Sequence, residues 1–387
     1  MMSKKMKLRA GIFCSLVMLI TAASDSLRGV FLPQFRSSFS LTEPQAARII
    51  MVSYIGNLLF LSVGGRLSDR LPRKKFIGGV LILWSAALCS YIFTENYYLL
   101  LFAIMFSMGG STMISTSVNI VTPLMFASPA MFVSLFNFLQ GIGITASQNI
   151  GGRFADRLTA WHIANAILFG LAVISFILLM TLDLPDPEPS GEKISIGRIL
   201  RDPASLLLIC CCGGYFIAEH GLQNWLTSYG SEHLGMTVAS SAVYLSMFYG
   251  SLTVGRLIFA PFIDRIGIFR CLIIWSAAGA VLYSIGFGLG KSGLILVAAA
   301  GFAYSILYPL LVMLIGEFFD TSVAGSATGL ILSIATFFDI FFNAFFGRLV
   351  EAKGYGTAIY VLPAAAAVFS IMLLVLKFGV KRAKDIR

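Results

Sequence analysis

Apolar stretches long enough to cross a lipid bilayer recur along the whole chain. A membrane-spanning helix needs about 20 mostly apolar residues, and twelve such stretches can be placed in the sequence. They run over residues 10–35, 46–67, 76–94, 98–125, 131–152, 162–182, 204–229, 238–261, 270–289, 292–315, 323–347 and 357–378. Only 12% of the residues are charged, whereas a soluble protein carries about a quarter. The pattern predicts an all-α membrane protein with twelve transmembrane helices.

The basic residues between these stretches predict the orientation of the chain. Eighteen Lys and Arg fall in the segments on one side of the membrane and seven on the other, and the richer side is the cytoplasmic one. Both termini are therefore expected in the cytoplasm, for a multi-pass protein of the cytoplasmic membrane. The formal net charge of +10 then reflects cytoplasmic loops and not a nucleic-acid partner. The basic N-terminal segment resembles a signal peptide, but Asp25 and Arg28 follow without a small-residue cleavage site, so we expect an uncleaved first helix.

The chain contains an internal repeat. Asp69 follows the second predicted helix and Asp264 follows the eighth, while Arg153 and Arg348 lie at the ends of the fifth and the eleventh. Both pairs are separated by 195 residues, and two independent landmarks rarely share one offset by chance. We therefore expect two parallel halves with a central binding site, as in transporters built from repeats. The predicted halves are residues 1–182 and 204–387, joined by a cytoplasmic linker at 183–203.

The loop after the second predicted helix reads GRLSDRLPRKK, from Gly65 to Lys75. It resembles the signature loop of the major facilitator superfamily, with Pro72 where that family usually has Gly. The resemblance implies a secondary transporter of two six-helix halves. Charge pairs at this loop are expected to hold the cytoplasmic side closed during part of the transport cycle. The predicted gating residues are Asp69, Arg70, Arg73, Asp264, Arg265 and Arg256, with binding of an anionic group as the alternative role of Arg256.

Two further stretches are similar to the fucose/glucose/galactose–proton symporter branch of that superfamily. One is SDSLRGVFLPQF in the first helix, and the other is AEHGLQNWLTSY in the seventh, followed by VGR, which ends at Arg256, in the eighth. That branch commonly carries an acid in the fourth helix, and none lies between Tyr98 and Thr122 here. The resemblance implies uptake of a sugar or a related metabolite together with a proton.

Acidic residues inside the predicted membrane helices are the candidate proton-coupling groups. A charged side chain there costs about 2.5–3.5 kcal/mol on insertion scales, so it should face a cavity or a partner. Asp25 in the first half and Glu219 in the second fall at nearly equivalent positions of the repeat, and Asp339 in the eleventh helix is a third candidate. A carboxyl group removed from water binds a proton more readily. The alternative for Asp25 is a structural ion pair with Arg28, which lies three residues further on the same helix face.

Polar side chains near these acids are the candidate substrate ligands. Gln223, Asn224 and Trp225 adjoin Glu219, and amides beside a Trp suit a sugar, because amides bind hydroxyls and the indole stacks on the ring. The alternative is that these polar groups hold helices together. We expect His220 to point away from this face as a packing residue, and substrate and proton to meet where the first and seventh helices adjoin. Further candidate ligands are Asn137 and Gln140 in the fifth helix and Asn343 in the eleventh.

Nothing in the sequence predicts an enzyme, a cofactor or a metal site. There is no phosphate-binding loop and no nucleophile or metal-ligand constellation, and the six Cys imply no disulfide. The expected partners are a small-molecule substrate, protons and the lipid bilayer, for a monomeric protein.

Two other functions stay open. A drug or metabolite efflux antiporter typically has a Gly-Pro pair near the end of the fifth helix, where this chain has Ser147 and Gln148. A receptor or scaffold is the more remote alternative, since it would not need acids at matching depths in both halves.

Overall fold

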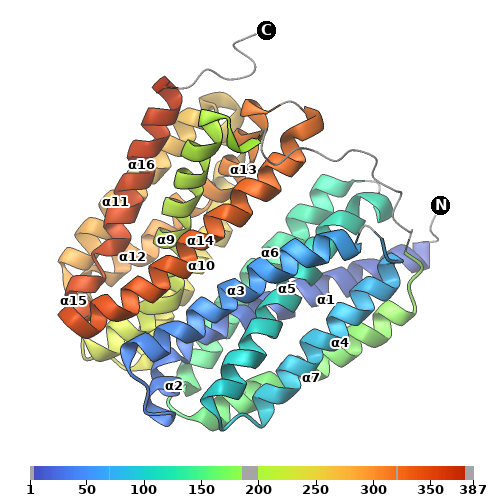
Figure 1. Ribbon diagram of the computed structural model, residues 1–387, viewed down its shortest axis with the longest axis horizontal. Coiled ribbons are helices and arrows are strands. Elements are labelled where there is room, and N and C mark those ends of the chain that lie inside the picture. The colour runs from blue at the N-terminus through green and yellow to red at the C-terminus, as the bar shows by residue number, and fades with distance from the viewer. Residues whose placement is uncertain (1–3, 69, 127, 185–198, 320, 380–387) are drawn as a thin grey trace. The chain divides into compact units, whose positions relative to one another are not determined.

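The computed structural model describes residues 4–379, except for residues 69, 127, 185–198 and 320. In this described part the regular secondary structure is helical and no β-strand is found (Figure 1). Among the described residues, eleven helical segments are long and apolar enough to cross a membrane, and the remaining predicted stretch, 131–152, is helical as part of α6 (Pro129–Phe154). The prediction of an all-α membrane protein is confirmed.

Contacts divide the chain into two compact units. The first consists of Met1–Gly191 with Val238–Val243, and the second of Glu192–Thr237 with Tyr244–Arg387. Each unit is described by itself below. Most of the predicted linker, 185–198, lies outside the described residues, so the predicted domain boundary stays a prediction.

The first unit is built from six long helices and one short helix. They are α1 (Lys4–Val30), α2 (Leu32–Ser38), α3 (Glu43–Ser68), α4 (Arg73–Ile92), α5 (Tyr97–Met125), α6 (Pro129–Phe154) and α7 (Leu158–Met180). Helix α1 packs against α5, α6 and α7, and α3 packs against α5. Small residues allow these close approaches: a Cβ atom on Gly56 of α3 would lie 2.1 Å from the carbonyl oxygen of Met105 in α5.

The described part of the second unit contains α9 (Pro203–Glu232), α10 (Val238–Ile266, apart from its first residues Val238–Val243), α11 (Ile268–Gly288), η1 (Gly290–Gly293), α12 (Leu294–Tyr304), α13 (Leu307–Phe318), α14 (Thr321–Lys353), α15 (Tyr355–Ala358) and α16 (Val361–Gly379). Helix α9 packs against α14 and α16, and most of its side chains are buried. Within each unit the first long helix is thus enclosed by later ones. Polar side chains on α1 and α9 are therefore presented to neighbouring helices within their own units.

One predicted span is interrupted in the structure. The stretch 292–315 is divided into α12 and α13 at Ser305 and Ile306. Pro309 has no backbone N–H, so it cannot bond to the carbonyl four residues earlier, which belongs to Ser305. Nε of Arg256, in α10, donates to that carbonyl at 3.2 Å instead. The break is thus closed by a side chain from a neighbouring helix of the same unit.

Candidate functional site

In the first unit, Asp25 and Arg28 both lie on α1 but bond to different residues of the neighbouring helices α3 and α5. The Asp25 carboxylate accepts a hydrogen bond from the hydroxyl of Ser111 in α5. In the described part of the chain, Arg28 has no ion-pair partner, so the predicted alternative of a direct ion pair between the two is not found. Asp25 remains close enough to Arg28 for an electrostatic interaction.

The Arg28 side chain is 5% exposed. Its Nη2 donates to the Tyr54 hydroxyl of α3 at 3.3 Å, and its Nη1 donates to the thioether sulfur of Met108 in α5. The guanidinium carbon lies 5.0 Å from the centre of the Tyr54 ring. A cavity of about 10 Å³, which is room for roughly one water, is lined by Asp25, Arg28, Tyr91 and Ser107 among others.

The candidate ligands on α6 are held within the first unit. The Asn137 amide donates to the Val133 carbonyl of its own helix at 2.9 Å. The Gln140 amide donates to the Ser115 hydroxyl of α5 at 3.2 Å. Both side chains are half-buried. Their role in substrate binding stays a prediction.

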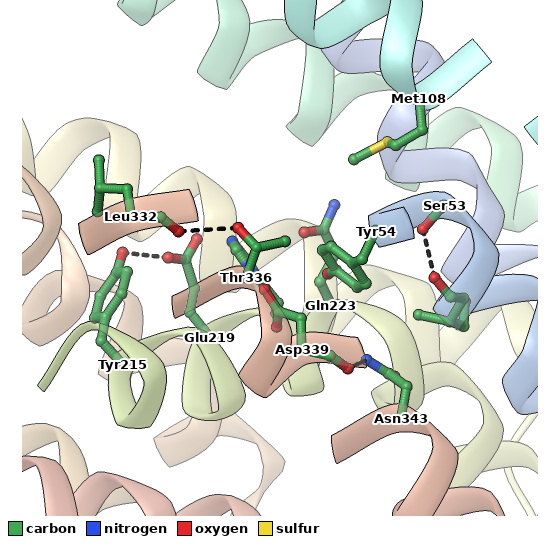
Figure 2. Close-up of polar contacts among 12 residues, drawn as sticks. Ser53, Tyr54, Met108, Tyr215, Glu219, Gln223, Leu332, Thr336, Asp339 and Asn343 are labelled. Atoms are coloured by element: carbon green, nitrogen blue, oxygen red, sulfur yellow. Dashed lines mark hydrogen bonds and ion pairs between the residues drawn. The ribbon is translucent and has the colours of Figure 1, made fainter. Parts of the chain in front are cut away.

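In the second unit, the acid Glu219 is 9% exposed. The hydroxyl of Tyr215, one turn earlier on α9, donates a hydrogen bond to its carboxylate (Figure 2). Further tyrosines, Tyr283 of α11 and Tyr304 of α12, stack on each other with ring centres 5.1 Å apart, and Tyr215 lies 6.0 Å from Tyr304. The hydrogen-bond partner of Glu219, Tyr215, thus belongs to a cluster of three tyrosines.

The expectation that His220 is only a packing residue is incomplete. Its ring stacks on Phe216 with centres 4.9 Å apart, as a packing residue would, but its Nδ1 also lies 2.9 Å from Oδ2 of Asp339 on α14, with which it forms an ion pair when protonated. The Asp339 side chain is 1% exposed, whereas the His220 side chain is 26% exposed. The reason is the rotation of α9, which turns the His220 side chain toward α14. The pair thus links a buried acid to a partly accessible base.

Asn343 extends this connection to Trp225. The Asn343 amide donates to the Asp339 carbonyl at 2.7 Å, and its oxygen accepts from the Trp225 indole at 2.8 Å. Trp225 is fully buried, with its ring centre 4.7 Å from that of Phe346. His220, Asp339, Asn343 and Trp225 therefore form one network between α9 and α14, part of which is visible in Figure 2.

The remaining candidates on α9 differ in accessibility. Gln223 is half-buried and accepts a hydrogen bond from the Tyr249 hydroxyl of α10 at 3.0 Å. Asn224 is fully buried. Among the predicted ligands of this helix, Gln223 thus has the exposed surface that a solute needs. His220, which was not predicted as a ligand, is also partly exposed.

The internal repeat extends to one equivalent pair of hydrogen bonds. Tyr54 bonds to Arg28 in the first unit, and Tyr249 bonds to Gln223 in the second. The two tyrosines are separated by 195 residues, as are Arg28 and Gln223. Each unit therefore holds the same position of its first long helix through a tyrosine of its next long helix.

The predicted gating residues are only partly described. Asp69 and the side chain of Asp264 lie outside the described residues. Arg70 and Arg265 are exposed and Arg73 is half-buried. Arg256 supports the helix break at Ser305 within its own unit. A gating role for this set stays a prediction. In the described part of the chain, no three His, Cys, Asp or Glu side chains gather as a metal site would require.

Comparison with known proteins identifies the chain's relatives. The family model of the Major Facilitator Superfamily matches residues 14–337. The cis,cis-muconate transport protein of Acinetobacter baylyi is 21% identical over 382 residues, covering 92% of this chain and 91% of that one. The 3-(3-hydroxy-phenyl)propionate transporter of Escherichia coli is 25% identical over 403 residues, covering 96% and 95%.

Solved structures show the same fold. The nucleoside transporter NupG has a TM-score of 0.74 at 14% identity and covers 97% of this chain and 100% of its own. The fucose:proton symporter FucP of E. coli has a TM-score of 0.67 at 20% identity and covers 95% and 98%.

Proposed function

Since the chain belongs to the Major Facilitator Superfamily, and is therefore a multi-pass membrane transporter of small solutes and not an enzyme, we propose that it takes up a small polar metabolite by proton symport. Alternating access of its two halves would carry the solute across the cytoplasmic membrane. In the second unit, residues of α9 and α14 would bind solute and proton, and in the first unit residues of α1 are further candidates.

The pair of His220 and Asp339 carries the proton-coupling part of this proposal. Asp339 is 1% exposed in a membrane-spanning helix, and its ion-pair partner is a histidine, whose charge depends on its own protonation. A permanent cation such as Arg would fix the acid in its charged form, whereas an imidazole can exchange protons near neutral pH. Since His220 is 26% exposed, it offers the buried acid a route to water. Asp25 and Glu219, each bonded to a hydroxyl group, are the further coupling candidates.

The candidate substrate class is a sugar or another small polar metabolite. Gln223 on α9 and Gln140 on α6 present amides that are only half-buried, which suits the binding of hydroxyl or carboxylate groups. The two sequence relatives are named for organic acids, and the structural neighbours are named for a nucleoside and a sugar. All of these are small polar solutes. Trp225 and Asn343, which are buried, would hold α9 and α14 together beside the bound solute.

Transport by purified protein in liposomes tests the proposal and separates it from efflux by antiport. We expect an acidic outside to drive accumulation of a solute that stabilises the protein against heat, selected from sugars, organic acids and drugs. A protonophore should abolish that accumulation. If an acidic inside drives accumulation instead, the protein is an antiporter. If neither gradient matters, proton coupling is wrong.

The orientation can be tested with single cysteines in a variant that lacks the six natural ones. The excess of Lys and Arg predicts that the 183–203 linker lies in the cytoplasm and that the end of α6 near the exposed Asp156 lies outside. We expect a membrane-impermeant thiol reagent to label Asp156→Cys in intact cells, and Ser190→Cys only after permeabilisation. Labelling of Ser190→Cys in intact cells would reverse the orientation.

A further inference from the structure

Arg28 is a buried cation with neutral hydrogen-bond partners. It is 5% exposed in a membrane-spanning helix, where a charge is costly unless something compensates it. Its hydrogen bonds go to the Tyr54 hydroxyl and the Met108 thioether, and its buried Nε has no hydrogen-bond partner in the described part of the chain. Asp25 lies near, but its carboxylate bonds to Ser111. The guanidinium therefore keeps hydrogen-bonding capacity for another acceptor.

The equivalent position of the second unit carries no charge. The equivalent position of the second unit holds Gln223, which bonds to Tyr249 as Arg28 bonds to Tyr54. A neutral amide thus fills the same structural place, with a tyrosine hydroxyl 3.0 Å away. The hydrogen bond to the tyrosine therefore does not require the positive charge of Arg28, which lies near Asp25 without a direct ion pair.

We infer that Arg28 binds the acidic group of the substrate, so that the transported solute is a small organic anion carrying a carboxylate. This inference rests on the proposed transport function and narrows its substrate class. The planar guanidinium donates two parallel hydrogen bonds to a carboxylate, and such charge-assisted bonds are about twice as strong as neutral ones. A thioether sulfur is a weak acceptor, so a carboxylate that replaces Met108 at Nη1 gains a much stronger interaction than it displaces.

Thermal stabilisation of the full-length protein in detergent tests this assignment. The probes are three acids with neutral counterparts, each pair at equal ionic strength: benzoate and benzamide, succinate and succinamide, glucuronate and glucose. We expect at least one acid to stabilise the wild-type protein while its neutral counterpart does not. Arg28→Gln should raise the concentration of that acid needed for half-maximal stabilisation by about tenfold to a hundredfold, the usual effect of losing a charged hydrogen bond.

Two variants serve as controls. Arg28→Lys keeps the charge but loses the bidentate geometry, so we expect a smaller loss than for Arg28→Gln. Arg157→Gln removes the same charge at a side chain that is 81% exposed, and it should bind the acid as the wild type does. Arg28→Gln should fold, since Gln occupies the equivalent place in the second unit, and its melting temperature without added solute shows whether it does.

Several outcomes would overturn the inference. These are stabilisation by a neutral probe alone, no stabilisation by any of the acids at millimolar concentration, or unchanged acid binding by Arg28→Gln. The proposed function fails separately, because it depends on accumulation in response to a pH gradient and this assay measures binding without a membrane. A protein that binds an acid through Arg28 but ignores the gradient would contradict only the symport proposal.

Discussion

Replacing Asp339 with Asn is expected to stop accumulation of solute against its gradient while leaving solute exchange intact. Asn has nearly the shape of Asp and can still form a hydrogen bond with His220, but it cannot take up and release a proton. Net uphill transport requires the carrier to return without its proton, whereas exchange of labelled for unlabelled solute requires no net proton movement. The variant should therefore separate the two activities.

The size of the effect follows from the driving force. With one proton per solute and no membrane potential, a gradient of one pH unit supports at most about tenfold accumulation. We expect this ratio to fall to about one in Asp339→Asn, measured in liposomes with the external side acidic. Counterflow of labelled solute should continue at a comparable rate. His220→Gln keeps a side chain able to form hydrogen bonds but removes the titratable partner, so we expect it to shift the pH profile of transport.

Glu351→Gln is the matched control, because Glu351 lies on the same helix, α14, and is exposed. It should accumulate solute as the wild type does. If Asp339→Asn folds and still accumulates solute fully, Asp339 is not the coupling acid. Asp25→Asn and Glu219→Gln would then be compared in the same assay.

The all-α membrane architecture could be predicted because the bilayer imposes a length and an apolar composition on every span. The break in the predicted span 292–315 was missed for a physical reason that the sequence does contain. Pro309 lies inside an apolar run, and hydropathy does not register that a proline frees the carbonyl of Ser305. What the sequence does not show is the donor that satisfies this carbonyl, Arg256, which comes from another helix.

The acids on the membrane helices were also recognisable from the sequence, but their partners were not. Arg28 lies three positions after Asp25, a spacing that suggests an ion pair, yet in the structure each side chain bonds to residues of other helices. Which helix a polar group reaches depends on helix rotation and packing, and neither is encoded by spacing along one helix. The sequence does contain an indication that His220 is more than a packing residue. It lies 195 residues after Asp25 and so occupies the equivalent position in the repeat.

Substitution by alanine is expected to have opposite effects on stability at Gly56, in the close contact of α3 with α5, and at Gly79, on α4. A Cβ atom on Gly56 would lie 2.1 Å from the Met105 carbonyl oxygen, whereas one on Gly79 of α4 would meet nothing within 4 Å. Alanine in a helix interior is favoured over glycine by roughly 0.5–1 kcal/mol. Gly79→Ala should therefore keep or raise the melting temperature. Gly56→Ala should lower it, because overpacking against backbone costs about 1–3 kcal/mol or more.

The contact at Gly56 also sets the surroundings of Arg28. Tyr54 precedes Gly56 by two residues on α3, and Met108 follows Met105 by three on α5, so the same helix approach positions both hydrogen-bond partners of Arg28. Forcing α3 and α5 apart should weaken solute binding as well as stability, in a thermal assay with and without the solute that the wild type binds. Gly79→Ala should leave binding unchanged. A Gly56→Ala protein as stable as the wild type would show that the two helices separate at little cost, and that their close approach does not fix the geometry around Arg28.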